Sequence, residues 1–168
     1  NMNSSLSYDA FTQAYNPDFA FGYGSWVFEQ DGYISDTVPM VDIILWVSDT
    51  ELWHKQNLES NPSDYSFLGK YFYNILQKSG AKIYYHPYVN FQWLQVKYGV
   101  SSLQDIKTDL EHWTYLYVAG RMHKPVSYIQ NCPELSDAIQ KNLEHALRVA
   151  LCFLWESFTQ EELFQAIA

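Results

Sequence analysis

Residues 19–25, Phe-Ala-Phe-Gly-Tyr-Gly-Ser, and residues 38–47, Val-Pro-Met-Val-Asp-Ile-Ile-Leu-Trp-Val, decide the fold class of this chain. The second stretch is dense in β-branched and apolar residues, which is typical of a strand covered on both faces. The first predicts a short strand that runs into a sharp glycine-serine turn, from which a helix can open. Together with the helical patterns that follow, these strands predict a mixed α/β (α+β) fold.

Helices and strands alternate through the middle of the sequence. Thr50 is expected to cap a helix over residues 50–58, and either Asp64 or Ser66 to start another that runs through residue 77. The next elements are predicted to be two strands, residues 82–85 and 91–98, on either side of a His86-Pro87 turn, and then a helix over residues 103–118.

The character of the chain changes near residue 125. Residues 136–154 carry a helical apolar repeat, and Thr159 with Glu162 forms a capping box for a last helix. The sequence therefore predicts a catalytic domain over residues 1–125 and a helical segment over residues 126–168.

Composition limits the class of protein. The chain has 168 residues, of which 48% are hydrophobic, so it can bury a substantial core. Its formal net charge of -9 would repel polyanions, which argues against general nucleic-acid binding. No apolar run approaches the roughly 18 residues that span a bilayer, and the two cysteines have no metal-ligand spacing. An anionic substrate must therefore meet a local cationic cluster, for which the candidates are Lys97, Arg121, His123 and Lys124.

The Gly22-Tyr23-Gly24-Ser25 turn is the first candidate site. Glycines after a strand let backbone N–H groups approach a phosphate, and a serine hydroxyl can donate a further hydrogen bond. The turn lacks the third glycine of a dinucleotide fingerprint and the lysine of a P-loop, so neither of those sites is expected. By itself such a turn is more often only a turn.

Asp42 is the second candidate, because it is the one charged side chain in the apolar stretch of residues 38–47. A carboxylate there needs a hydrogen-bonding partner, a cation or a bound metal, and a purely structural aspartate is an equal alternative. A glycine-serine turn followed by an acid on the next apolar strand resembles the layout of polymerase-β-like nucleotidyltransferases. In those proteins the turn holds the triphosphate and the strand acid holds Mg²⁺.

Longer motifs make the resemblance specific. The segments that carry it are Phe21 to Ser25, Met40-Val41-Asp42, Trp53-His54 with Asn57-Leu58, Asn61 with Tyr65-Ser66, Lys97-Tyr98-Gly99-Val100, and residues 116–126, Leu-Tyr-Val-Ala-Gly-Arg-Met-His-Lys-Pro-Val. They resemble the mitochondrial translocator assembly and maintenance family, also known as the mitochondrial-type phosphatidate cytidylyltransferases. The similarity runs from about residue 20 to the end of the chain.

This resemblance implies a polymerase-β-like nucleotidyltransferase domain with a mixed sheet, followed by a winged-helix-like helical segment. It implies an enzyme that uses CTP and Mg²⁺ to convert phosphatidate to CDP-diacylglycerol for cardiolipin synthesis. It also implies a peripheral location on the matrix face of the mitochondrial inner membrane. Bacterial relatives exist, and for a bacterial member the surface is the cytoplasmic face of the cell membrane. The family chain continues past Ala168 into a part that resembles a membrane-binding tail, so this chain is expected to be C-terminally truncated.

The resemblance also assigns roles to residues. Asp42 would hold Mg²⁺, and Tyr23, Gly24 and Ser25 would bind the nucleotide. Lys97 would contact the triphosphate from a strand beside that of Asp42, or else it is only a surface lysine on a strand edge. The basic residues at 121, 123 and 124 are expected to bind the phosphate of the lipid headgroup, or else only to follow a helix C-terminus, where cations are favoured. His54 and Asn57 share a helix face that is either a polar surface or a nucleotide contact.

One departure from the wider nucleotidyltransferase pattern leaves the metal site open. Ile44 occupies the position of the usual second acid, so other ligands are needed, and Asp49, Asp109 and Glu111 are candidates.

Two alternative functions also stay open. One is a nucleotidyltransferase with another acceptor, and the other is a non-enzymatic module that supports a membrane complex. The sequence predicts neither an acyl-chain preference nor an oligomeric state.

Overall fold

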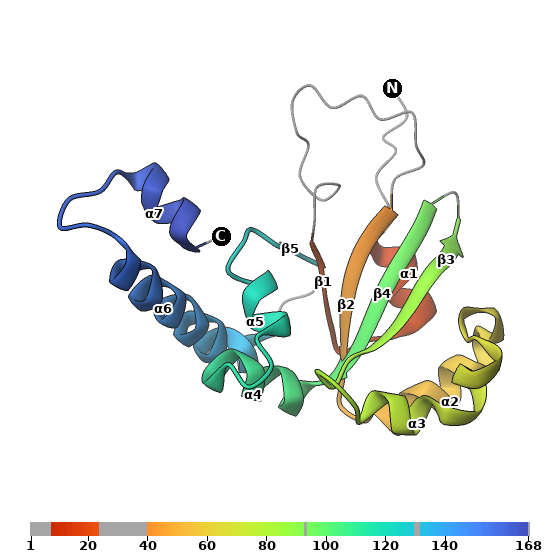
Figure 1. Ribbon diagram of the computed structural model, residues 1–168. Coiled ribbons are helices and arrows are strands. Elements are labelled where there is room, and N and C mark those ends of the chain that lie inside the picture. Colours follow the sequence, from red (N-terminus) through yellow and green to blue (C-terminus); the bar gives the residue numbers. More distant parts are fainter. Residues whose placement is uncertain (1–7, 24–39, 93, 130–131, 168) are drawn as a thin grey trace, which may run out of the picture. The chain divides into compact units, whose positions relative to one another are not determined.

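The computed structural model describes residues 8–23, 40–92, 94–129 and 132–167 (Figure 1). The chain divides into two compact units. The first comprises Asn1–Leu103 and Ser127–Asn131, and the second comprises Gln104–Val126 and Cys132–Ala168. These units do not by themselves define domains, so the division into domains at residue 125 stays a prediction.

A five-stranded sheet forms the centre of the first unit, with the strand order β3-β4-β2-β1-β5. The strands are β1 (Phe19–Tyr23), β2 (Met40–Val47), β3 (Tyr84–Phe91), β4 (Leu94–Ser102) and β5 (Ser127–Tyr128). Strands β2 and β4 are parallel, whereas the other neighbours are antiparallel. The predicted mixed α/β fold with a mixed sheet is therefore confirmed.

Helices cover one face of this sheet. The first unit contains α1 (Tyr8–Tyr15), α2 (Thr50–Ser60) and α3 (Phe67–Gln77), with a short 3-10 helix at Pro62–Asp64. Phe11 from α1 and Trp53 from α2 join Ile43, Val96 and Tyr98 of the sheet in one buried cluster. In Figure 1, α1 crosses behind the central strands.

Strand β2 is buried on both faces, as its apolar sequence predicts. Val41, Ile43 and Leu45 belong to the helix-covered core, while Ile44 and Trp46 on the alternate face are fully buried as well. The ring of Trp46 lies 4.2 Å from that of Phe19 between centroids. The exceptions on this strand are Asp42, which is partly buried, and Met40 at its start, which is exposed.

The start of each middle helix is fixed by a side-chain cap. The carboxylate of Asp49 accepts a hydrogen bond from the N–H of Leu52 at 3.0 Å, so Asp49 and not Thr50 caps α2. Ser66 caps α3 by accepting from the N–H of Gly69 at 3.1 Å, which is one of the two predicted starts. Aspartate and serine are both favoured N-cap residues, so the sequence alone could not separate neighbouring candidates.

The predicted His86-Pro87 turn is wrong. Strand β3 continues through both residues, and its pairing with β4 shifts register between His86 and Val89. Because β3 is an edge strand, Pro87 removes no N–H that a neighbouring strand needs, and an irregular register is where proline is tolerated. The chain reverses instead after Phe91, where Gln92 has a φ of 55°.

Helices make up the second unit. They are α4 (Leu103–His112), α5 (Tyr117–Arg121), α6 (Ser136–Phe153), α7 (Gln160–Ile167) and a 3-10 helix at Pro133–Leu135. The long helix predicted over residues 103–118 is wrong, because the chain leaves α4 after His112 and both Trp113 and Leu116 have positive φ, 53° and 55°. Positive φ is unfavourable for side-chain-bearing residues, so this break requires compensating contacts.

The C-terminal predictions hold. Thr159 and Glu162 form the reciprocal capping box: the carboxylate of Glu162 accepts from the Thr159 N–H at 2.7 Å, and the Glu162 N–H donates to the Thr159 hydroxyl at 3.2 Å. Helix α6 matches the predicted helix to within one residue at its C-terminal end. Among the described residues, no helix is both long and apolar enough to cross a membrane. The winged-helix character of this segment stays a prediction.

Candidate functional site

Asp42 and Lys97 face each other on the two parallel strands at the centre of the sheet. They are direct partners in the β2–β4 register, and the Lys97 Nζ lies 3.9 Å from Oδ1 of Asp42. The predicted proximity of their strands is therefore confirmed. Their side chains are 33% and 28% exposed, so both remain accessible to a ligand. An ion pair this exposed contributes at most about 1 kcal/mol to stability, so stability alone does not account for two charges on an apolar sheet.

Two tyrosines extend the site across the sheet. Tyr23, the last residue of β1, is the register partner of Asp42 on its other side. The hydroxyls of Tyr23 and Tyr85 are 3.5 Å apart, and the Lys97 Nζ lies 4.9 Å from the centroid of the Tyr85 ring. Four neighbouring strands thus contribute one polar side chain each to a single face. Tyr85 was not predicted as a site residue, because its place depends on the register shift in β3.

Gly99 creates the room for the Tyr85 ring. A Cβ at this position would lie 2.8 Å from Cε1 of Tyr85 and 3.0 Å from Cδ1 of Ile44. Both distances are too short for ordinary packing, so a side chain at this position would displace Tyr85 or the buried Ile44. Gly99 is two residues beyond Lys97 on the same strand face, so it lets the Tyr85 ring lie beside the lysine.

The partly exposed carboxylate of Asp42 suits Mg²⁺, which commonly binds one or two carboxylates together with substrate phosphates and water. No group of three or more His, Cys, Asp or Glu side chains that could hold a metal occurs within the described ranges. Among the described residues, the donors around Asp42 suit a metal that is shared with a polyphosphate. Further protein ligands remain unassigned.

The candidate acids for a second ligand have other roles. Asp49 caps α2 beyond the far end of β2, which at about 3.3 Å per residue places it roughly 20 Å from Asp42. Asp109 is buried, and its two oxygens accept hydrogen bonds from four backbone N–H groups at 2.7–3.1 Å, those of Tyr115, Leu116, Val118 and Ala119. Glu111 lies 4.0 Å from the Lys107 ammonium.

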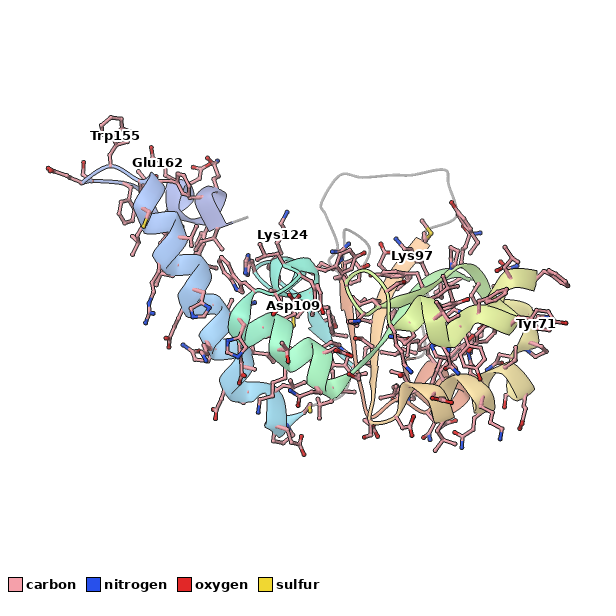
Figure 2. The ribbon with its side chains drawn as sticks, turned by 60° about the horizontal axis from the view of Figure 1, so that its bottom comes forward. Tyr71, Lys97, Asp109, Lys124, Trp155 and Glu162 are labelled. Atoms are coloured by element: carbon pink, nitrogen blue, oxygen red, sulfur yellow. The ribbon has the colours of Figure 1, made fainter. Side chains whose placement is uncertain are left out.

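Asp109 therefore explains the break after α4. Its carboxylate accepts hydrogen bonds from backbone N–H groups between the end of α4 and the start of α5. These hydrogen bonds offset the energetic cost of the positive φ at Leu116. Figure 2 shows Asp109 in the interior of the second unit. Much of the family-like segment at residues 116–126 is thus organised by one buried aspartate.

The three predicted headgroup ligands have different surroundings within the second unit. The Arg121 guanidinium stacks on Tyr117, with Cζ 3.7 Å from the ring centroid, and donates to the Tyr117 hydroxyl at 2.8 Å. His123 Nε2 lies 3.1 Å from Oδ1 of Asn142. Lys124 is exposed (Figure 2). Their role in phosphate binding stays a prediction, and Lys124 has the most accessible charge of the three.

His54 and Asn57 do not form a polar surface, because both are buried, and a nucleotide contact stays a prediction. The His54 ring nitrogens lie 2.8 Å from the Tyr65 hydroxyl and 2.9 Å from Oε1 of Gln77. Asn57 donates to the hydroxyls of Tyr65 and Tyr98 at 3.2 and 3.1 Å. These family-like residues therefore tie α2 to α3 and to the sheet.

A second part of this buried network surrounds Asp64. Its carboxylate accepts from the hydroxyls of Tyr15 at 2.9 Å and Tyr98 at 2.7 Å. Burial, reinforced by the negative charge of Asp64, raises the pKa of both tyrosines. Burial also lowers the pKa of His86 to about 3, and this ring stacks on Tyr98 with centroids 4.4 Å apart. His86 is therefore neutral at pH 7. The hydrogen bonds of this network hold the helices against the sheet.

Two of the predicted nucleotide ligands, Gly24 and Ser25, lie outside the described residues. They follow Tyr23 directly in the sequence. Their proposed role is therefore neither supported nor opposed by the geometry above.

The mixed sheet, with an acid and a lysine paired on adjacent parallel strands, can be compared with known proteins. The family model described as mitochondrial phosphatidate cytidylyltransferase matches residues 8–168. The chain belongs to this family.

Three similar relatives carry the same name, "Phosphatidate cytidylyltransferase, mitochondrial". The protein of Schizosaccharomyces pombe is 42% identical over 154 residues, which cover 89% of this chain and 39% of the relative. That of Xenopus laevis is 40% identical over 157 residues, covering 89% and 46%, and that of Homo sapiens is 40% identical over 156 residues, covering 89% and 34%. The chain thus spans less than half the length of each of these three relatives.

Proposed function

We propose that this chain carries the catalytic part of a phosphatidate cytidylyltransferase, which joins CTP and phosphatidate to give CDP-diacylglycerol and pyrophosphate. Membership of the family supports the reaction class. The observation that carries the proposal is the Asp42–Lys97 pair, with its atoms 3.9 Å apart on adjacent parallel strands. An accessible carboxylate and an accessible ammonium side by side suit a metal-bound polyphosphate, which needs both kinds of partner.

The reaction needs positioning more than proton transfer. A phosphate oxygen of phosphatidate attacks the α-phosphorus of CTP, a new P–O bond forms, and the bond from the α-phosphorus to the bridging oxygen breaks. The electron pair leaves with pyrophosphate. Because the attacking oxygen is already anionic, no general base is required, which agrees with the absence of a second acid beside Asp42 at Ile44.

Lys97 supplies positive charge where two anionic substrates meet. Its ammonium already lies over the Tyr85 ring and beside Asp42, so it is held on the reacting face of the sheet. We assign it to the CTP phosphates, with Tyr23 and the Gly24-Ser25 turn as further nucleotide contacts. A Mg²⁺ ion held by Asp42 would neutralise charge on the phosphates and on the departing pyrophosphate.

The remaining parts of the proposal concern fold and location. We assign the sheet unit to the polymerase-β-like class and the C-terminal helices to a winged-helix-like segment. Arg121, His123 and Lys124 are proposed to meet the phosphate of the lipid headgroup. The protein would work peripherally at a membrane, on the matrix face of the mitochondrial inner membrane or, in a bacterium, on the cytoplasmic face of the cell membrane.

Release of pyrophosphate tests the proposal. It should be measured with each common NTP, with and without phosphatidate in detergent micelles, for this chain and for a version extended at its C-terminus. Release that requires both CTP and phosphatidate supports the reaction. Release with CTP and another acceptor would favour a different nucleotidyltransferase. If neither chain releases pyrophosphate, the non-enzymatic module is favoured.

A further inference from the structure

Helix α3 directs its apolar side chains toward solvent. Phe67, Tyr71 and Ile75 follow one another at four-residue spacing, so they form one stripe along the helix, and they are 75%, 71% and 66% exposed. Leu68 and Phe72 on the adjoining row are exposed as well. Figure 2 shows Tyr71 pointing away from the sheet unit. A helix of a folded unit normally buries such a stripe.

The opposite face of α3 is fixed inward by small and polar residues. Gly69 is buried, and a Cβ there would overlap the hydroxyl of Tyr84. Gln77 is buried too, and its amide donates to the carbonyl oxygens of Lys82 at 2.8 Å and Val100 at 3.1 Å. Rotating α3 to bury its apolar stripe would break these contacts. The exposed stripe is therefore a fixed property of this unit.

The sequence segment that contains the stripe is basic, whereas the chain as a whole is acidic. Residues 65–104 contain four lysines and no Asp or Glu, within a chain of net charge -9. Lys70 lies within α3 and Lys78 follows it at its C-terminal end, and both are exposed. Lys82 comes shortly afterwards in the same acid-free segment. An apolar and aromatic stripe bordered by lysines is the composition that binds an anionic lipid surface.

We propose that α3 is a docking helix for an anionic lipid bilayer, with Phe67, Tyr71 and Ile75 entering the headgroup boundary and Lys70 and Lys78 contacting lipid phosphates. The inference deepens the proposed function and rests on it, because a lipid substrate requires this chain to reach a bilayer. A second copy of the chain fits this face less well, since a symmetric pair would bring the same lysines together.

The C-terminal end of the chain offers a contrasting apolar surface. Phe153 and Trp155 are 80% and 87% exposed there (Figure 2). Their neighbours include Glu156, Glu161 and Glu162, which anionic lipids would repel. Both surfaces therefore expose apolar residues, but only α3 adds lysines that would attract anionic lipids. Variants of the C-terminal surface can thus serve as a control for the loss of exposed aromatic side chains.

Co-sedimentation with vesicles tests the proposal without nucleotide or metal. One preparation contains only phosphatidylcholine, and the other contains equal amounts of phosphatidylcholine and phosphatidylglycerol. We expect binding to the anionic vesicles that weakens as salt is added. The triple variant Phe67→Gln, Tyr71→Gln and Ile75→Gln should lose about tenfold or more in affinity, and Lys70→Gln with Lys78→Gln about fivefold for each lysine.

The matched control is Trp155→Gln with Phe158→Gln, which also removes exposed aromatic side chains and should bind as the parent chain does. Thermal unfolding should be unchanged in all variants, because the substituted side chains are exposed. Failure of the parent chain to bind anionic vesicles would overturn the proposal. So would equal binding by the triple variant, or a dimer in sedimentation velocity that this variant dissociates.

Transfer to a short-chain, monodisperse phosphatidate separates this inference from the proposed function. That substrate needs no bilayer, so the α3 variants should retain the transfer. If the parent chain binds anionic vesicles through α3 but makes no CDP-lipid, the proposed function fails while the docking surface stands. If transfer occurs but α3 variants bind vesicles normally, the docking surface fails alone.

Discussion

Asp42 on β2 and Lys97 on β4 are direct register partners on parallel strands, with Oδ1 and Nζ 3.9 Å apart. The pairing places one negative and one positive group on the sheet face that also carries Tyr23 and Tyr85. Because both groups remain partly exposed, each can exchange its present partner for a substrate or a metal. The proposed chemistry depends on this relationship, and the first two predictions test its two members separately.

Asp42→Asn should abolish most turnover while the protein stays folded. The amide keeps the size of the side chain but loses the negative charge that would hold Mg²⁺, and we expect pyrophosphate release to fall about a hundredfold or more. The matched control is Asp49→Asn, an acid beyond the other end of the same strand that caps α2. It should cost at most about 1 kcal/mol of stability and leave activity intact. Equal activity of Asp42→Asn and the parent chain would refute the metal assignment.

Lys97→Ala should raise the KM for CTP and lower kcat, because the lysine is assigned to charge that is present in CTP and grows on the leaving pyrophosphate. We expect a loss of about a hundredfold in kcat/KM. Lys107→Ala, which removes a partly exposed lysine near Glu111, serves as the control and should be neutral. If both variants behave alike, Lys97 has no special role.

The sequence predicts this central pair but not its surroundings. The apolar strand around Asp42 and the neighbouring strand of Lys97 follow from local composition, so their proximity could be inferred. Tyr85 could not be placed, because its face depends on the register shift between His86 and Val89. Periodicity alone does not reveal a bulge in an edge strand.

Local sequence patterns also failed to predict where α4 ends and which faces of α2 and α3 are buried. The break after α4 depends on Asp109, whose hydrogen-bond partners come after the helix itself. His54 was predicted to lie on a polar surface or to contact the nucleotide, yet its ring is buried and hydrogen-bonded to Tyr65 and Gln77. In α3 the apolar stripe faces outward, which contradicts the usual assumption that the apolar side is the core side.

Asp109→Asn should destabilise the second unit without touching the Asp42–Lys97 pair. The substitution replaces one of two oxygens that accept backbone N–H groups by an amide that donates, so buried donors at Val118 and Ala119 or at Tyr115 and Leu116 lose their acceptor. We expect a loss of about 2–4 kcal/mol in the free energy of unfolding. Urea denaturation measures it, and Asp105→Asn, on the same helix, is the control. A change below that of the control would contradict this role for Asp109.

The free energy of unfolding should fall as the pH is lowered from about 6.5 toward 3. Burial lowers the pKa of His86 to about 3, and it also lowers the pKa of His54, whereas both rings have ordinary values near 6.5 when unfolded. The unfolded state therefore binds more protons in this window, and each histidine contributes up to about 1.4 kcal/mol per pH unit. Above the unfolded value their contribution to stability is complete.

Urea denaturation at a series of pH values checks this dependence. His86→Asn should reduce the slope, even though it also lowers stability by removing the stacked ring beside Tyr98. A slope that does not change when His86 is replaced would contradict its assignment as a buried neutral group.

The central claim is that the α-phosphoryl group of CTP moves to phosphatidate on the face that carries Asp42 and Lys97. The most direct measurement is to supply CTP labelled at the α-phosphorus, or separately at the γ-phosphorus, with phosphatidate and Mg²⁺, and to extract the lipid. The proposal predicts that only the α-label enters the lipid and that Asp42→Asn prevents it. Label from the γ-position in the lipid, or no lipid label in either the parent chain or its C-terminally extended form, would contradict the proposed function.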